Sequence, residues 1–221
     1  MRATWRWTGL LSVWLVLAGC SNDPNRIDYT QLARSLVEAF QPDRQGGQAA
    51  AEPAAVLAGT EGPLIQVRPQ NGNATYYILG LIDNGPYRTY ATGTRQTMTL
   101  RQGVITATRG LGSDLMASDV TQLLELLRTQ RSGPARRVMQ YLDGEDVTRD
   151  LVLACDVSLG ATVRVAAGEI DQTGRRMTEA CSAGPISFRN TYVVDGAGQV
   201  IQSEQWLSPG AGSALFQVLR H

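Results

Sequence analysis

The chain has 221 residues with 20 basic and 20 acidic side chains, so its formal net charge is zero. A chain of this length can bury a real core in one domain or two small ones. The balanced charge argues against a nucleic-acid partner. The single histidine is the last residue, His221, so histidine triads and histidine metal sites are not expected.

The N-terminal segment has the layout of a bacterial export signal. Arg2 and Arg6 precede an apolar run from Leu10 to Leu17, as in secretory signals. The motif Leu17-Ala18-Gly19-Cys20 resembles the lipobox, after which the cysteine thiol is diacylated and becomes the new N-terminus. The run is too short for a helix that crosses about 30 Å of hydrocarbon. An ordinary signal peptide with an incidental cysteine is the remaining alternative.

Lipidation at Cys20 predicts a membrane-anchored protein, because two or more acyl chains hold a protein stably at a bilayer. Ser21 follows the cysteine where an aspartate would retain the protein in the inner membrane, by resemblance to enterobacterial sorting. We therefore expect an outer-membrane lipoprotein that faces the periplasm.

Three parts are expected along the chain. Residues 1–19 form the signal peptide, residues 20–55 the lipidated cysteine, tether, short helix and flexible connector, and residues 56–221 a β-rich domain. The helix in the second part is predicted from an Asp28/Gln31 capping pair and an apolar spacing that ends before Pro42; its apolar positions are Leu32, Leu36, Val37 and Phe40. Residues 41–55, rich in Gln, Gly, Ala and Pro, are the connector.

The rest of the chain is dominated by short segments of β-forming residues with glycine-containing turns between them. A bend over Arg109–Met116 precedes a second amphipathic helix, which has Asp119 and Gln122 as a capping pair and ends before Ser132-Gly133-Pro134. The expected strands are 64–68, 75–82, 87–92, 94–101, 104–109, 136–142, 149–157, 162–168, 175–180, 186–195, 199–207 and 213–219, with hairpin turns at Asp143-Gly144 and Asp195-Gly196. The fold class is therefore mainly β: an antiparallel meander that closes into a barrel-like or sandwich sheet with two short amphipathic helices.

Three cysteines are present. With Cys20 assigned to lipid, Cys155 and Cys181 form an even pair, which in an oxidising compartment indicates a disulfide. A reactive pair or a metal site is the alternative, but a metal would need more cysteine or histidine ligands than the chain has. No metal and no cofactor are expected.

An ordered set of short motifs between Leu64 and Trp206 resembles the YjbF/GfcB family of outer-membrane lipoproteins, which are linked to exopolysaccharide and group 4 capsule operons. The motifs are Asp83-Asn84-Gly85, Thr89-Tyr90, Gln96–Arg101, Thr108–Gly112, Asp114–Met116, Cys155–Val157, Phe188–Asp195 and Gln205-Trp206. The chain departs from the family at Val193, where an aromatic residue is common, and in its tail at Ser208–Gly210. The resemblance implies a mainly β fold and a role in polysaccharide production or export, and it offers no catalytic residues.

Binding is a better hypothesis than catalysis, and we do not expect an enzyme. Sugars bind by stacking on aromatic rings and by hydrogen bonds to planar polar groups, which makes Arg109, Asp114, Tyr90 and Trp206 candidate binding residues. Tyr76, Tyr77, Tyr87, Tyr192 and Arg189 belong to the same wider set. The structural alternatives are core packing for the aromatic residues and an Arg109–Asp114 salt bridge that shapes the bend.

Three functions compete at this stage. The first is an anchored accessory protein for exopolysaccharide or capsule export that binds a partner export protein or the polymer. The second is a lipid- or lipoprotein-handling chaperone, which would need an apolar cavity. The third is a surface-glycan hydrolase, which would need two facing carboxylates.

Overall fold

The structure is a computed structural model that describes residues 52–72, 74–142 and 147–221. The predictions for Cys20, for the helix from Asp28 and for the Asp143-Gly144 turn lie outside these ranges. The described residues form α2 (Pro53–Gly59), β1 (Leu64–Pro69), β2 (Tyr76–Asn84), β3 (Tyr87–Ala91), β4 (Thr97–Arg101), β5 (Val104–Arg109), β6 (Leu115–Asp119), α3 (Thr121–Thr129), β7 (Gly133–Leu142), β8 (Thr148–Ala167), β9 (Ile170–Ala183), β10 (Ile186–Val194), β11 (Val200–Ser208) and β12 (Gly212–Arg220).

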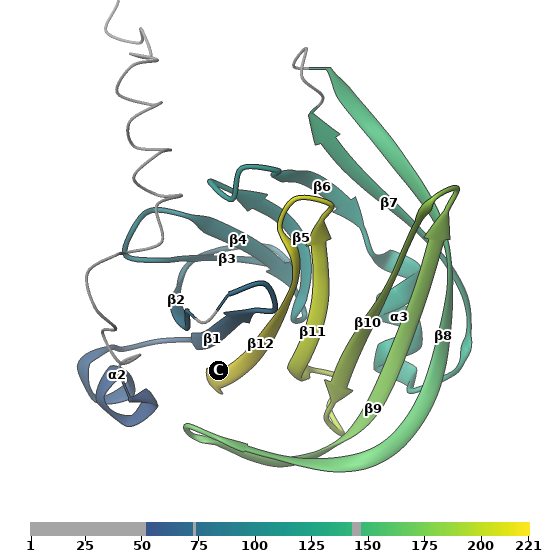
Figure 1. Ribbon diagram of the computed structural model, residues 1–221. Helices are drawn as coiled ribbons and strands as arrows, with labels where there is room; N and C mark the ends of the chain where they lie inside the picture. Colours follow the sequence, from purple (N-terminus) through teal and green to yellow (C-terminus); the bar gives the residue numbers. More distant parts are fainter. Residues whose placement is uncertain (1–51, 73, 143–146) are drawn as a thin grey trace, which may run out of the picture. The chain divides into compact units, whose positions relative to one another are not determined.

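The twelve described strands belong to one antiparallel sheet in which consecutive strands are also sheet neighbours, except β5 and β6 (Figure 1). β1 pairs with β12 from Ile65↔Val218 to Pro69↔Ala214, so the first and last strands join and the meander curls almost into a ring. Among the described strands, β5 and β6 are the two that lie at the sheet edges. The predicted fold class is thus confirmed: the domain is mainly β, with a nearly closed, barrel-shaped sheet.

Alternating burial explains why these segments are strands. In β8, Leu153, Cys155 and Val157 are buried while the residues between them are exposed, as expected for a strand with one face on a core. The pattern breaks at a register shift between Leu159 and Thr162. For this reason the two strands predicted over 149–157 and 162–168 are one strand of 20 residues.

The helices differ from the sequence prediction in detail. α3 is amphipathic as expected, and Leu123, Leu124 and Leu127 are buried. Its predicted capping pair is wrong: Asp119 Oδ1 accepts from the Thr121 amide, and Gln122 Oε1 accepts from the amide of Arg136 on β7. α2 occupies part of the predicted connector, with Pro53 at its first turn, where proline is well tolerated. No helix in the described part of the chain is long and apolar enough to cross a membrane.

Side chains from inside the sheet satisfy the backbone of β5, which has no strand partner on its second edge. Gln205 on β11 accepts from the Ile105 amide at 3.0 Å and donates to the Gly103 carbonyl at 2.8 Å. Arg137 on β7 donates to the Ile105 carbonyl at 3.3 Å. These hydrogen bonds hold β5 against the interior. They replace part of the backbone hydrogen bonding that a neighbouring strand would supply.

Replacing Gln205 with leucine is therefore expected to destabilise the fold by about 2–3 kcal/mol, because the buried Ile105 amide and the half-buried Gly103 carbonyl lose their partner. Urea denaturation of Gln205→Leu against the wild type measures this. The control is Gln202→Leu on the same strand, where Gln202 is half-buried and bonds to another side chain, that of Gln217. Equal midpoints for Gln205→Leu and the wild type would contradict this role.

The tip of the β8–β9 hairpin is fastened to the end of β12. The Glu169 amide donates to the Leu219 carbonyl, and Arg220 forms an ion pair with the Glu169 carboxylate at 2.7 Å. Arg220 also donates to the carbonyls of Leu57 and Thr60. One arginine thus links the hairpin tip, the last strand and the chain segment that enters the domain.

This fastening should weaken in acid. Hydrogen bonding from Arg220 lowers the pKa of Glu169 below its ordinary value of 4.5. The ion pair therefore contributes stability above that ordinary value, and the contribution is lost as the pH falls through the depressed pKa. We expect amide exchange at residues 166–171, corrected for intrinsic rates, to gain protection between pH 3 and pH 6. Glu169→Gln should remove the part of this pH dependence that comes from the Arg220 pair, while Asp171, whose pKa is lowered by hydrogen bonding from Arg164, keeps its own part. An unchanged profile in the variant would contradict the assignment.

Candidate functional site

A cleft of about 790 Å³ opens at the end of the sheet where β6 begins and β7 ends. Its walls come from the bend between β5 and β6, from the end of β7, from the starts of β8 and β10, and from the turn after β11. The lining residues are Arg109, Gly112, Ser113, Asp114, Met116, Tyr141, Leu142, Arg149, Asp150, Leu151, Ile186 and Pro209. Two of the four predicted binding residues, Arg109 and Asp114, therefore line one cleft.

Arg109 bridges the gap between the two sheet edges. Its Nη1 donates to the Leu115 carbonyl at 3.0 Å and also to the Thr108 carbonyl, and its Nη2 reaches the Met116 carbonyl at 3.4 Å. The predicted salt bridge to Asp114 is absent from the described ion pairs. Instead the guanidinium joins the end of β5 to the start of β6, and its exposed side chain remains at the cleft wall.

Asp114 organises the bend from within. Its Oδ1 accepts from the Leu111 amide and the Thr108 hydroxyl, and its Oδ2 accepts from the Gly110 amide at 2.7 Å. Gly110 has a φ of 83°, a left-handed conformation that glycine adopts without strain. Both carboxylate oxygens are engaged by the loop, which suits a structural role better than acid–base chemistry.

Three aromatic side chains pack against one another beside this cleft. Trp206 stacks on Phe188 with 4.4 Å between ring centroids and meets Tyr141 edge-on at 6.4 Å. The Tyr141 hydroxyl donates to the Leu207 carbonyl at 2.7 Å, and burial raises the pKa of Tyr141. Trp206 is half-buried, whereas Tyr141 lines the cleft. Trp206, which was proposed from sequence as a binding residue, therefore packs against a cleft residue, Tyr141, and does not line the cleft itself.

Tyr90 lies elsewhere. It is 9% exposed and lines a separate hollow of about 310 Å³ with Arg88, Asp83 and His221. Burial raises its pKa. The structure therefore does not bring Tyr90 together with Arg109, because β3 and the bend after β5 contribute to different hollows.

A buried polar cluster lies in the interior of the sheet. Glu179 Oε2 accepts from Arg137 at 3.0 Å, from Asn190 at 2.7 Å and from the Tyr192 hydroxyl at 2.9 Å. Burial raises the pKa of Tyr192 well above its usual value, so the hydroxyl keeps the proton that it donates. Burial alone would lower the pKa of Arg137, but the negative charge of Glu179 and the interactions with Tyr192 and Tyr141 together outweigh it, and the pKa is raised. The guanidinium thus stays charged, and Tyr192, a candidate from sequence, is a core residue.

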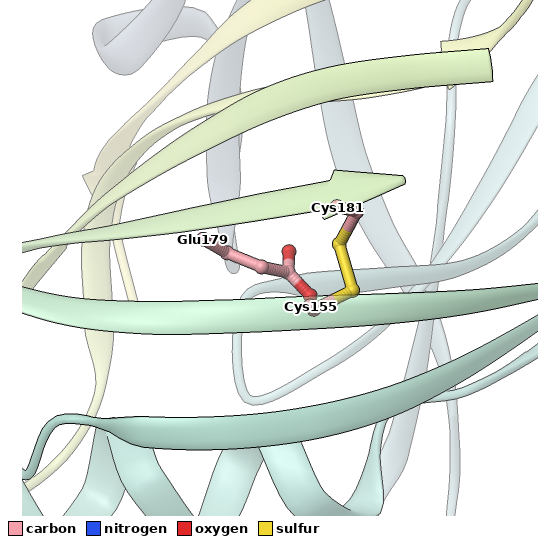
Figure 2. Close-up of side chains that lie close together, drawn as sticks. All are labelled: Cys155, Glu179 and Cys181. Atoms are coloured by element: carbon pink, nitrogen blue, oxygen red, sulfur yellow. A yellow bond between two sulfur atoms is a disulfide. The ribbon is translucent and has the colours of Figure 1, made fainter. Parts of the chain in front are cut away.

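The disulfide lies beside Glu179 of this cluster, as Figure 2 shows. Cys155 on β8 and Cys181 on β9 are directly opposite in the register and their sulfurs are bonded. The sulfurs and a Glu179 oxygen lie within 4.8 Å of one another, a grouping with metal-ligand chemistry. Since both sulfurs are used in the S–S bond, the oxidised protein offers a cross-link here. Glu179 Oε1 has no hydrogen-bond partner among the described protein atoms.

Sequence reasoning missed Tyr141, Arg149 and Asp150 as cleft residues. They flank the predicted Asp143-Gly144 turn, and only the pairing of β7 with β8 and of β6 with β7 places them opposite Arg109. The pair Arg137–Glu179 was missed as well, because a charge within a strand pattern normally faces solvent.

Residues 33–219 match the model of a known protein family. That family is described as the group 4 capsule polysaccharide lipoprotein family GfcB, YjbF. The chain belongs to this family. A solved structure, that of the hypothetical lipoprotein YmcC from Escherichia coli K12, superposes with a TM-score of 0.65 at 14% identity, over 89% of this chain and 97% of that one. At that identity the likeness shows the fold alone. A search of curated proteins found no match.

Proposed function

We propose that this GfcB/YjbF-family protein is anchored in the outer membrane by a diacylated Cys20, faces the periplasm and assists the production or export of exopolysaccharide or capsule. The observation that carries the proposal is the family match over residues 33–219. The lipobox before Cys20 supports the anchor, and Ser21 supports the outer membrane. In this proposal residues 1–19 are removed and residues 20–55 connect the anchor to the β-rich domain.

The protein acts by binding, either to the polymer or to a partner protein of the export machinery. The cleft beside Arg109 combines a tyrosine, two arginines and two carboxylates around a rigid bend. Such a surface has the planar polar groups and the aromatic ring that carbohydrate recognition uses. No step of this role requires a catalytic residue.

The two other hypotheses gain no support from the described residues. A lipid carrier needs an apolar cavity, whereas one continuous cluster of buried side chains fills the interior of the sheet. A glycan hydrolase needs free facing carboxylates, and the Asp114 carboxylate is occupied by the bend.

Deletion of the gene tests the proposal. The amount and chain length of secreted polysaccharide are measured in the deletion strain and after complementation with the wild type or with Cys20→Ala. We expect loss or shortening of the secreted polymer, restored by the wild type and not by Cys20→Ala at matched protein level. Unchanged amount and length in the deletion strain would refute the function.

A further inference from the structure

The first helix of the described domain is apolar on every side, yet the domain does not enclose it. α2 has the sequence Pro-Ala-Ala-Val-Leu-Ala-Gly, and none of its residues is buried. Ala54, Ala55 and Ala58 are exposed. A helix without a polar side is normally surrounded by protein or by lipid. α2 therefore presents an apolar surface that the described residues leave uncovered.

α2 lies on the outer face of the sheet. Ile65 and Ile78 are paired on β1 and β2 and belong to the core. The neighbouring pair, Leu64 and Leu79, therefore points to the outer face, because side chains alternate along a strand. Arg220 is opposite Leu64 on β12 and shares that face, and its guanidinium donates to a backbone carbonyl of α2. This bond holds the helix beside Leu64.

Two aliphatic side chains of β2 continue this apolar surface. Leu81 and Ile82 are 58% and 65% exposed, the highest values among the large apolar side chains of the described residues. Ile82 is opposite Thr89, whose neighbour Tyr90 belongs to the core, so Ile82 points to the outer face. Leu81 is the extra residue of the β2 bulge that precedes Ile82. We call α2, Leu79, Leu81 and Ile82 the apolar patch.

The patch offers apolar side chains and no free strand edge. β2 is paired with β1 on one edge and with β3 on the other, so a partner peptide cannot be added here as a further strand. The charges nearby are not those of a site for anionic headgroups: Glu52 and Glu61 flank α2 and are exposed, and Asp83 pairs with Arg88. A lipid surface would therefore be held by apolar contact, which requires neither backbone hydrogen bonds nor basic side chains.

The chain that leads from the proposed anchor ends at this patch. Residues 21–52 lie between Cys20 and α2, and they span at most about 110 Å when fully extended. The anchor thus keeps the patch near the bilayer, where a contact too small to recruit a free domain can still orient an anchored one. We propose that the apolar patch lies on the phospholipid surface that holds the anchor, with Leu81 and Ile82 at the boundary between headgroups and acyl chains. This inference rests on the proposed lipidation of Cys20.

Fluorescence quenching by lipid tests the contact. The lipidated protein is reconstituted in phosphatidylcholine vesicles with or without brominated acyl chains, which quench tryptophan on contact. Trp206 is the one tryptophan that follows the proposed signal peptide. Ile82→Trp adds a reporter in the patch, and Val152→Trp is the matched control at an exposed position on β8, far from β2 in the strand order. We expect brominated lipid to reduce the added emission of Ile82→Trp about twofold, since interfacial side chains lie about 5–10 Å deep, and to leave Val152→Trp unchanged, at low and at high salt.

A charge placed in the patch should break the contact. Adding Leu81→Glu to Ile82→Trp should abolish the quenching, whereas Leu159→Glu, at another exposed leucine on β8, should leave it intact. Thermal unfolding verifies that both variants are folded. Absence of quenching in Ile82→Trp, or quenching that persists with Leu81→Glu, would overturn the proposal. A blue shift of the Ile82→Trp emission that grows with protein concentration and not with lipid would assign the patch to a second copy, and would overturn it as well.

Failure of the contact is distinguishable from failure of the proposed function. If Cys20 carries lipid but brominated vesicles do not quench Ile82→Trp, the anchor stands and the contact is wrong. If Cys20 carries no lipid but vesicles mixed with the protein still quench Ile82→Trp, the contact stands and the anchor is wrong.

Discussion

Replacing Arg137 with methionine is expected to destabilise the fold by about 3–5 kcal/mol, the cost of breaking a buried ion pair. Arg137 and Glu179 are 1% and 0% exposed, so the variant leaves an uncompensated carboxylate in the core. The variant also removes the donor to the Ile105 carbonyl and thus one of the bonds that hold β5. Urea denaturation, with the midpoint and slope compared to the wild type, measures the loss.

The companion variant separates charge from packing. In Arg137→Met/Glu179→Gln the buried negative charge is removed while the hydrogen-bond acceptor for Asn190 and Tyr192 is kept. We expect the double variant to be more stable than Arg137→Met alone. Arg164→Met, which breaks an exposed ion pair with Asp171, is the matched control and should change stability little. Equal stability of Arg137→Met and the wild type would contradict a structural role for the buried pair.

Removal of the disulfide is expected to cost about 3.5 kcal/mol in the chain-entropy model, given the sequence separation of 26 residues between Cys155 and Cys181. The cross-link joins β8 to β9, the two longest strands of the sheet. Thermal and urea unfolding of Cys155→Ala/Cys181→Ala should both show this loss, and treatment of the wild type with dithiothreitol in denaturant should reproduce it. An unchanged midpoint in the double variant would show that the unfolded chain is not restrained by the bond.

Local pattern was enough to predict most of the strands and the fold class. Strands such as β1, β5 and β12 are rich in β-forming residues and lie next to glycine-containing turns, so their bounds agree closely with the prediction. β6 was missed because Leu115–Asp119 is short and follows a glycine bend; it is a strand only because β7 lies beside it. The two halves of β8 were separated in the prediction because a register shift interrupts the alternation that identifies a strand.

The candidate site could be predicted only in part. The bend that holds Arg109 and Asp114 was predicted, but the cleft that both residues line was not. Arg109 donates to backbone carbonyls and Asp114 accepts from backbone amides of the bend, and the two side chains do not pair with each other. Tyr90 is buried in another hollow, because strand register and not sequence proximity decides which face an aromatic ring occupies. Arg137 meets Glu179 across 42 positions, a separation at which a single sequence carries no signal.

The gap between β5 and β6 connects the fold to the proposed binding. A closed ring of strands would have no free edge, and a fully open edge would pair with other chains. Here Arg109, Arg137 and Gln205 satisfy backbone groups on both sides of the gap. The edge is thereby held in place beside the cleft that Arg109 lines.

Membrane anchoring through Cys20 is the claim on which the location and role of this protein depend. Cells that express the chain are labelled with tritiated palmitate, and the protein is then isolated from separated membrane and soluble fractions. We predict a labelled protein in the outer membrane and an unlabelled one when Cys20 is replaced with alanine. An unlabelled wild-type protein recovered from the soluble fraction would contradict the account.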